Sequence, residues 1–249
     1  MSMPRKKNTW DSIKRVALDE IAMRKGHKDF VTVVGDIERG ELLEVINSHR
    51  SEKIIEVLKQ QPIEVRAQVE EVSIDMWGGF PKVIAQVFPN AVLVYDRFHV
   101  MKLVNQELNK LRKTVAMTLQ GSHYLLLKNK DNLSEEQQFQ LEQVLNHSCC
   151  LRIAYELKEE FRQIYQTART PESGKRRFQT WLNHAQQLYQ ESSQTIRDHL
   201  EGICNYFINH SSSGAMEGIN NRIKLIKRQG YGFTNFDNFR SRLLACFSD

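Results

Sequence analysis

The first hundred residues alternate between short apolar runs and longer amphipathic segments. Apolar or β-branched residues are frequent in residues 13–19, 30–34 and 42–46, and the turn-forming segment 36–40 separates the last two runs. Runs of this kind, bounded by turn residues, are typical of β-strands. Three strands joined by tight turns predict an antiparallel meander at the start of the fold.

Helical and extended patterns alternate from there to about residue 115. Residues 51–61 carry apolar side chains on one helical face, residues 69–75 alternate as a half-buried strand does, and residues 80–88 form a compact helical pattern. Residues 91–95 are almost wholly apolar, which indicates a strand buried on both faces, and helical spacing resumes near residue 99. The order β-β-β-α-β-α-β-α predicts an α/β fold of the RNase H-like class, with a mixed five-stranded sheet of strand order 3-2-1-4-5.

The pattern between residues 116 and 210 is helical throughout. Ser134 and Gln137 predict a capping box at the start of one helix, and Phe178 and Trp181 lie on the apolar face of another. Residues 211–214 interrupt the pattern, and a further helix is expected from residue 215 to about 229. We therefore expect an RNase H-like core in residues 1–115 and 211–249, interrupted by an all-helical insertion domain in residues 116–210.

Acidic residues end several of the predicted strands. Asp19 ends strand one and Asp75 ends strand four, which are central neighbours, so both carboxylates are expected at one edge of the sheet. Asp36 ends strand two, which runs the opposite way, and is expected at the other rim. Asp96 ends strand five, one strand away from the pair. Carboxylate oxygens suit Mg²⁺, and two such ions serve phosphoryl transfer on DNA. Taken singly, each acid is better explained as a turn or capping residue.

The best candidate for a third acid is Glu217, at the start of the helix after residue 214. Ile219, Ile223 and Ile226 form an apolar stripe on that helix, at spacings that suit packing on the sheet. A second stripe, expected to face the active edge, carries Glu217 with three polar or basic residues, Asn221, Lys224 and Arg228. Glu217 alone would be explained as a solvated helical glutamate, and only the combination of three acids favours a metal site.

Basic residues near the end of the chain favour a partner with a phosphate backbone. The net charge is +5, which carries little weight alone. Asn221, Lys224, Lys227 and Arg228 are nevertheless close in sequence to Glu217, so we expect them to contact DNA backbone. The alternative is a solvated helix face.

Cysteine usage and hydropathy narrow the class of protein further. The four cysteines include no Cys-x-x-Cys pair, which argues against a structural zinc site. We find no secretory signal and no apolar run long enough to span a bilayer, so a cytoplasmic protein without membrane contact is expected, associated with the bacterial nucleoid when bound to DNA.

Three sequence blocks resemble the catalytic domain of DDE transposases of the ISL-three insertion-sequence family. The resemblance spans most of the chain, from about residue 16 to residue 244. The blocks are Leu18-Asp19-Glu20-Ile21-Ala22 with Lys25-Gly26-His27; Ser73-Ile74-Asp75-Met76-Trp77 with Asp96-Arg97-Phe98-His99; and Ser213-Gly214-Ala215-Met216-Glu217-Gly218 with Asn220-Asn221 and Lys227-Arg228. Each block alone is weakly specific, whereas three in this order are strongly specific.

This resemblance implies roles for particular residues. Asp19, Asp75 and Glu217 would be the catalytic, metal-binding triad, holding two Mg²⁺ ions or Mn²⁺ in their place. Asp96 and His99 are similar to an Asp-x-x-His element of such transposases. His99 would then bind a phosphate or orient a catalytic acid; equally, Asp96 would cap a helix and His99 would pack.

The same resemblance implies an enzyme that cleaves DNA at transposon ends and joins them to target DNA, acting as a homo-oligomer on DNA. Family members usually carry an amino-terminal DNA-binding region, and here the catalytic block begins within twenty residues of Met1. The alternative is therefore a truncated or catalytically inactive remnant that acts as a DNA-binding protein. A third hypothesis is another RNase H-like nuclease such as a junction resolvase, which the long insertion before the last acid disfavours.

Overall fold

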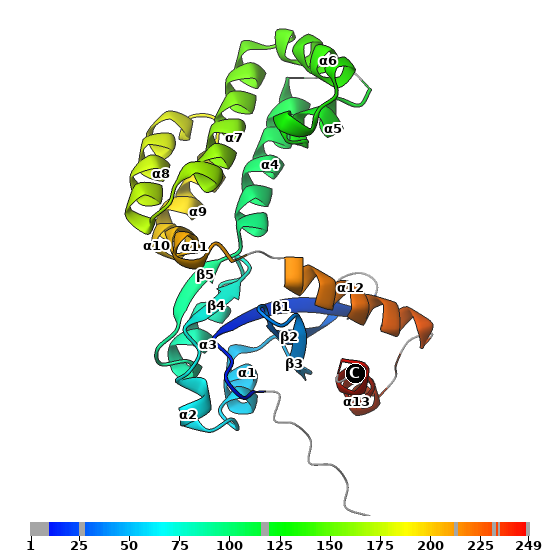
Figure 1. Cartoon of the computed structure of the whole chain (residues 1–249). Coiled ribbons are helices and arrows are strands. Elements are labelled where there is room, and N and C mark those ends of the chain that lie inside the picture. The colour runs from blue at the N-terminus through cyan, green and yellow to red at the C-terminus, as the bar shows by residue number, and fades with distance from the viewer. Residues whose placement is uncertain are drawn as a thin grey trace, which may run out of the picture. The chain divides into compact units, whose positions relative to one another are not determined.

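The computed structural model describes residues 10–24, 28–115, 120–211, 214–230, 233 and 235–247. The chain divides into two compact units, one formed by residues 1–96 together with 211–249 and the other by residues 97–210. The first is an α/β unit that contains the sheet, and the second is helical (Figure 1). Of the blocks noted in the sequence, Lys25-Gly26-His27 and Ser213 lie outside the described residues.

Five strands form one mixed sheet in the part of the chain that the structure describes. They are β1 (Arg15–Arg24), β2 (Lys28–Asp36), β3 (Glu41–Ile46), β4 (Glu71–Ile74) and β5 (Val92–Tyr95). Their order is β3-β2-β1-β4-β5. β2 pairs antiparallel with β1 and β3, whereas β4 pairs parallel with β1 and β5. The α/β, RNase H-like fold with strand order 3-2-1-4-5 is thus confirmed.

β1 is longer than the sequence pattern indicated, since it continues five residues beyond Asp19 to Arg24. Its pairing with β4 stops at Leu18, opposite Ile74, whereas its pairing with β2 goes on through Ile21, opposite Val31. The expectation that Asp19 ends strand one was therefore wrong. Asp19 instead lies where β1 loses its parallel neighbour, so it is still at the edge of the sheet where β4 ends.

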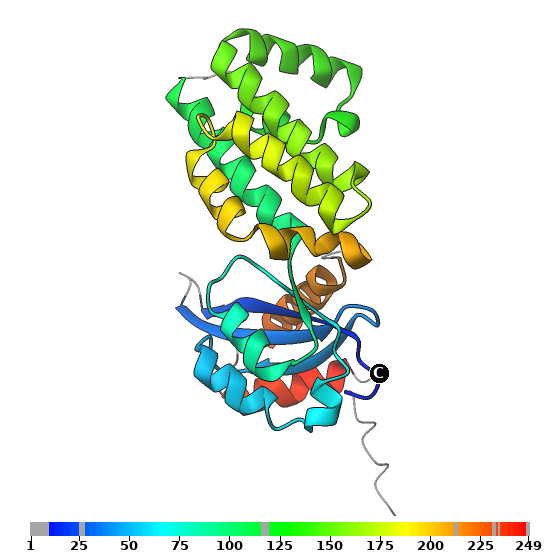
Figure 2. The same ribbon diagram turned by 90° about the vertical axis from the view of Figure 1, so that its left-hand side faces the viewer.

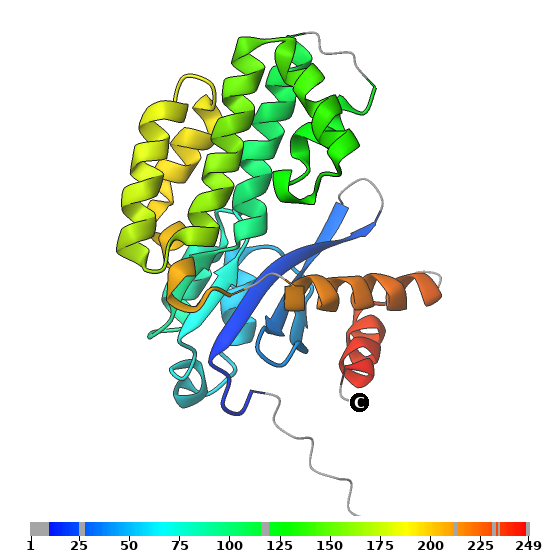
Figure 3. The same cartoon turned by 45° about the horizontal axis from the view of Figure 1, so that its top comes forward.

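Helices of the α/β unit pack on and around this sheet. α1 (Ser51–Leu58) contacts α3 (Phe80–Val87), and a short helix that the pattern did not indicate, α2 (Ile63–Arg66), lies between them in sequence. α12 (Gly214–Gln229) contacts β1 and β2, and α13 (Phe236–Cys246) contacts β3 (Figure 3).

The predicted apolar stripe of α12 forms part of the core. Ile219, Ile223 and Ile226 are buried in one cluster with Ala17 and Ile21 of β1. Alternate residues of a strand point to the same face, so Asp19, between Ala17 and Ile21, is on the face of the sheet that α12 covers. The packing of α12 thus determines what surrounds Asp19.

The helical unit has its own core. Its elements are α4 (Arg97–Thr114), α5 (Ser122–Leu127), a 3₁₀ turn η1 (Lys130–Asn132), α6 (Glu135–Asn146), α7 (Cys149–Thr167), α8 (Pro171–Ala185), α9 (Gln190–Asp198), α10 (Leu200–Cys204) and α11 (Tyr206–Asn209). α7 and α8 lie side by side (Figure 2) and bury Phe161, Phe178 and Trp181. The capping box of Ser134 and Gln137 at the start of α6 is confirmed.

α4 makes its helix contacts with α5, α7 and α9, within the helical unit. The sequence pattern had placed most of this helix, up to residue 115, with the first part of the core. In the described ranges of the chain, no helix combines the length and the hydropathy that crossing a bilayer requires.

Candidate metal-binding active site

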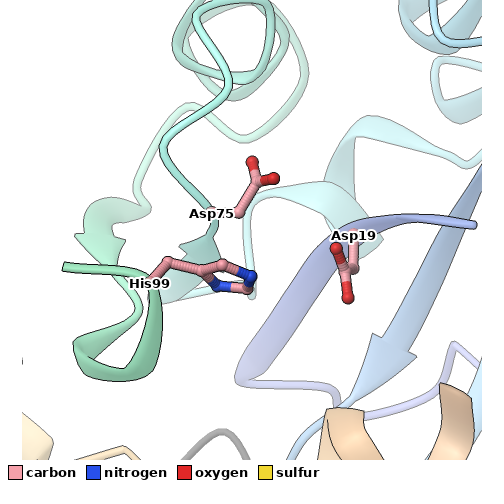
Figure 4. A group of neighbouring side chains, drawn as sticks. All are labelled: Asp19, Asp75 and His99. Atoms are coloured by element: carbon pink, nitrogen blue, oxygen red, sulfur yellow. The ribbon is translucent and has the colours of Figure 1, made fainter. Parts of the chain in front are cut away.

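Asp19 and Asp75 are brought together by the register of two parallel strands. Leu18 of β1 pairs with Ile74 of β4; Asp19 follows Leu18 within β1, and Asp75 is the first residue after β4 ends. The carboxylates of Asp19 and Asp75 and a ring nitrogen of His99 offer ligand atoms that all lie within 4.8 Å of one another (Figure 4). All three side chains are half-buried. The sheet topology therefore pairs the two aspartates, as the sequence predicted.

His99 is close to this edge through its chain connection. The backbone N–H of Asp96 donates to the carbonyl of Ile74 at 2.8 Å, and His99 follows three residues later in the first turn of α4. Asp96 itself is not part of the three-residue group. Of the two auxiliary residues proposed from the sequence, only His99 is thus placed beside the aspartates.

Hydrogen bonds orient both carboxylates. The backbone N–H of Glu20 donates to Oδ1 of Asp19 at 2.7 Å, and Nδ2 of Asn220 donates to Oδ2 of Asp19 at 2.5 Å. The backbone N–H of Trp77 donates to Oδ1 of Asp75 at 2.8 Å. These bonds fix the direction in which each carboxylate presents its oxygen atoms.

Glu20 places another carboxyl group beside Asp19 and Asp75 at this edge of the sheet. Its burial, followed by the charges of Asp75 and Asp19, raises the pKa of its carboxyl group to about 7. Its Oε1 is buried and has no hydrogen-bond partner among the residues that the structure describes. A cation at this edge would offset the repulsion that the ionised Glu20 carboxylate meets from its two acidic neighbours.

Glu217 lies in the first turn of α12, is exposed, and is not part of the group of Asp19, Asp75 and His99. Asn220, one helical turn further on, is the residue of α12 that reaches Asp19. The helix that carries Glu217 is therefore docked at the site through Asn220, whereas the Glu217 side chain is exposed.

The predicted DNA-contact residues of α12 fall into two sets. The structure shows exposed side chains at the positions of the predicted polar stripe, Asn221, Lys224 and Arg228. Lys227 is half-buried and donates from Nζ to the carbonyl of Ala22 in β1 at 2.9 Å. Burial lowers the pKa of the Lys227 ammonium group. The first three side chains are available to a ligand, whereas Lys227 is bonded to the sheet.

Sequence reasoning missed Asn220 and Glu20. Asn220 is adjacent to the exposed Asn221. It could have been recognised because it lies on the same face of α12 as Met216 and Ile223, which are both buried. A polar residue within a buried row needs a polar partner. Glu20 was missed because the predicted strand ended at Asp19, whereas β1 continues to Arg24 and carries Glu20 within it.

The donor set suits a divalent cation. Two carboxylates and one imidazole converge within a few ångströms, beside the further carboxyl group of Glu20. Carboxylate oxygens suit Mg²⁺ and Mn²⁺, and imidazole is a common ligand of transition metals. Asp19, Asp75 and His99 would hold such an ion at this edge.

Comparisons with known proteins agree with this chemistry. Residues 16–243 match the transposase family of the ISL-three DDE type. A transposase for insertion sequence element IS1001 from Bordetella parapertussis is 30% identical, over 96% of this chain and 62% of that protein. A transposase for insertion sequence element IS1557 from Mycobacterium tuberculosis is 25% identical, over 89% of this chain and 57% of that protein.

A shorter similarity, 32% identity over 42% of the chain, is to an ATP-dependent protease from Lactococcus lactis and covers 33% of that protein. The chain spans about three fifths of the length of the two transposases. Because the family match covers most of the sequence, including Asp19, Asp75 and Glu217, the chain belongs to the ISL-three family of DDE transposases.

Proposed function

We propose that this chain is the catalytic part of a DNA transposase, which cleaves DNA at transposon ends and transfers the freed strand to target DNA. The observation that carries the proposal is the pairing of Asp19 and Asp75 at one edge of the sheet, with ligand atoms no more than 4.8 Å apart. Two Mg²⁺ ions, or Mn²⁺ in their place, would stabilise charge on the attacking and leaving oxygens of the phosphodiester. The cytoplasm, at the nucleoid, is the proposed place of action.

The protein's own residues hold, orient and bind. Asp19 and Asp75 would hold the ions, with their carboxylates oriented by the N–H groups of Glu20 and Trp77. We propose Glu217 as the third metal-binding acid, which would contribute its carboxylate when ions and DNA are bound at this edge of the sheet. Three exposed residues on the same helix face, Asn221, Lys224 and Arg228, would bind the DNA backbone beside it. Lys227, which donates to the carbonyl of Ala22, would add positive charge to the same helix.

We further propose that the helical segment, residues 116–210 by the sequence pattern, is an insertion domain within the RNase H-like core. Asp96 and His99 connect the two parts, and His99 would assist in holding an ion or a phosphate. DNA ends and target DNA are the proposed partners, and a homo-oligomer on DNA is the proposed assembly.

The decisive assay measures nicking of DNA that carries the terminal repeats flanking the gene, with Mg²⁺ or Mn²⁺. Asp75→Asn is expected to abolish nicking, because it removes a charged ligand oxygen, while the circular dichroism spectrum stays unchanged. Asp198→Asn, at an exposed position of α9, is the matched control and should nick normally. Undiminished nicking by the Asp75 variant, or equal nicking in EDTA, would refute the proposal. DNA binding without any nicking by the unaltered chain would favour the non-catalytic remnant.

Glu217→Gln tests the third acid separately. Since Glu217 is exposed, the substitution should leave the melting temperature unchanged. Loss of a metal-directed carboxylate should reduce the nicking rate by about 100-fold or more. Glu64→Gln, an exposed glutamate in the first turn of α2, is the control. Equal rates for the two variants would remove Glu217 from the site.

A further inference from the structure

Asn220 carries a buried amide whose two ends have different environments. The residue is 9% exposed, and its Nδ2 lies 2.5 Å from Oδ2 of Asp19. An ionised carboxylate only accepts hydrogen bonds, so the amide must present its NH₂ group to Asp19. Its Oδ1 is then directed elsewhere, is buried, and has no hydrogen-bond partner within the described part of the chain.

This arrangement is unfavourable for stability alone. A buried acceptor without a partner costs roughly 1–3 kcal/mol, which is as much as a typical hydrogen bond to a charged group contributes. An apolar residue would suit the buried row of Met216 and Ile223 better, if packing were its whole role. The amide therefore serves the carboxylate that it contacts.

A second polar bond shows how α12 is aligned with β1. Lys227 donates to the carbonyl of Ala22, as Asn220 donates to Asp19. Asn220 and Lys227 are separated by roughly 10 Å along a helix, at 1.5 Å per residue. Asp19 and Ala22 are separated by roughly 10 Å along a strand, at 3.3 Å per residue. The two bonds thus fit one register of helix against strand.

In this register Asn220 lies between two of the acids proposed for the site, Asp19 and Glu217. Asn220 holds one oxygen of Asp19 while the N–H of Glu20 holds the other, so the plane of the carboxylate is fixed from two sides. Asn220 is also one helical turn from Glu217, and residues three apart on a helix are neighbours on its surface. One amide thereby links the orientation of Asp19 to the position of the helix that bears Glu217.

We propose that Asn220 is a positioning residue of the metal site, which holds the Asp19 carboxylate in the orientation that divalent-cation binding requires. The inference rests on the proposed function, because it assumes that Asp19 is a metal ligand. Asn220 acts through Asp19 and is not itself the ligand. Residues that orient metal ligands typically change metal affinity by 10–100-fold when they are replaced.

The test is the substitution Asn220→Leu in the full chain, with Mn²⁺ alone as the probe in isothermal titration calorimetry. Leucine has a similar size and removes both the donor and the unpaired acceptor. The melting temperature of the metal-free protein in EDTA should therefore be unchanged or higher, while the dissociation constant for Mn²⁺ should rise about tenfold or more. Asn220→Ala should show the same loss of affinity if leucine does not fit.

Asn90→Leu is the matched control, because it makes the same change of side chain and removes the hydrogen bond that Nδ2 of Asn90 donates to the carbonyl of Ala67 at 2.8 Å, without touching Asp19. Its Mn²⁺ affinity should stay within about twofold of the unaltered protein, well below the shift expected for a residue that orients a ligand. A lowered melting temperature with unchanged Mn²⁺ affinity in both Asn220 variants would mean a purely structural role and would overturn the inference. An unaltered chain that binds no Mn²⁺ would instead overturn the proposed function, so the two failures are distinguishable.

Discussion

Glu20 brings an extra carboxyl group to the edge where Asp19 and Asp75 meet. Burial, and then the charges of Asp75 and Asp19, raise the pKa of Glu20 to about 7. In the metal-free protein Glu20 therefore keeps its proton up to near neutral pH. Cation binding would supply positive charge and favour the ionised form, so metal affinity and protonation are coupled at this edge.

Glu20→Gln should stabilise the metal-free protein above pH 7. The folded pKa of Glu20, about 7, exceeds its ordinary value of 4.5, so the group's stabilising contribution is complete below pH 4.5 and is lost as the pH rises through 7. Glutamine carries no charge and avoids that loss. Melting curves in EDTA should show the variant a few degrees more stable at pH 8 and no more stable at pH 4.5.

Glu64→Gln, at an exposed position, serves as the control for the effect of removing one negative charge. A Glu20 variant with the same pH profile as the unaltered protein would contradict the prediction. So would a gain that is equally large at pH 4.5.

The two aspartates were predictable because they follow from topology. Strand order and direction alone place Asp19 and Asp75 at the same edge, and no side-chain detail is needed. Asn220 was not predictable in the same way, because its role depends on which of two adjacent residues, Asn220 or Asn221, faces the sheet. A helix advances 100° per residue, so a small error in its rotation exchanges the two.

At the scale of elements, α12 is held by apolar packing and by a close approach to β2. A Cβ atom at Gly35 would lie 2.7 Å from Cδ1 of Ile219 and 3.2 Å from Sδ of Met216. The register of β2 with β3 also shifts between Val34 and Gly35. Glycine at this position allows α12 to lie directly on the strand, which brings Asn220 within reach of Asp19.

Ile223→Ala should weaken this docking. Ile223 is fully buried in the cluster between α12 and the sheet, so truncation should lower the free energy of unfolding by roughly 2–4 kcal/mol. Leu225→Ala, on the same helix but 46% exposed, should change it by less than about 0.5 kcal/mol. Urea denaturation of both variants measures the difference. Equal effects would show that α12 is not docked by this face.

The lengths of elements were harder to infer than their order. β1 extends past Asp19 because β2 continues to pair with it after β4 has ended, and such pairing depends on a distant segment. The helix α2 is only four residues long and has no buried side chain, so it leaves no periodic pattern in the sequence. Strand order could be deduced, whereas boundaries set by tertiary contacts could not.

At the scale of the whole molecule, the aromatic residues of the helical unit form a core of their own. Phe161 lies with its ring centroid 5.0 Å from that of Phe178 and 4.6 Å from that of Trp181. Nε1 of Trp181 donates to the carbonyl of Leu157 at 2.7 Å, which satisfies the one polar group among these rings. The helical periodicity of residues 116–210 predicted such a core. The packing of α4 against this core could not be predicted, because the apolar face of a helix does not show which other elements it contacts.

Because each unit buries its own core, we expect local destabilisation of one unit to leave the other intact. Phe161→Leu removes part of a fully buried ring and should destabilise the helical unit by about 1–2 kcal/mol. Hydrogen exchange measured by mass spectrometry should then show faster exchange in α7 and α8, with unchanged exchange in β1 and β4. Ile223→Ala should produce the reverse pattern. If either substitution accelerates exchange equally in both units, the chain opens as a single cooperative structure, and the division between core and helical insertion has no energetic meaning.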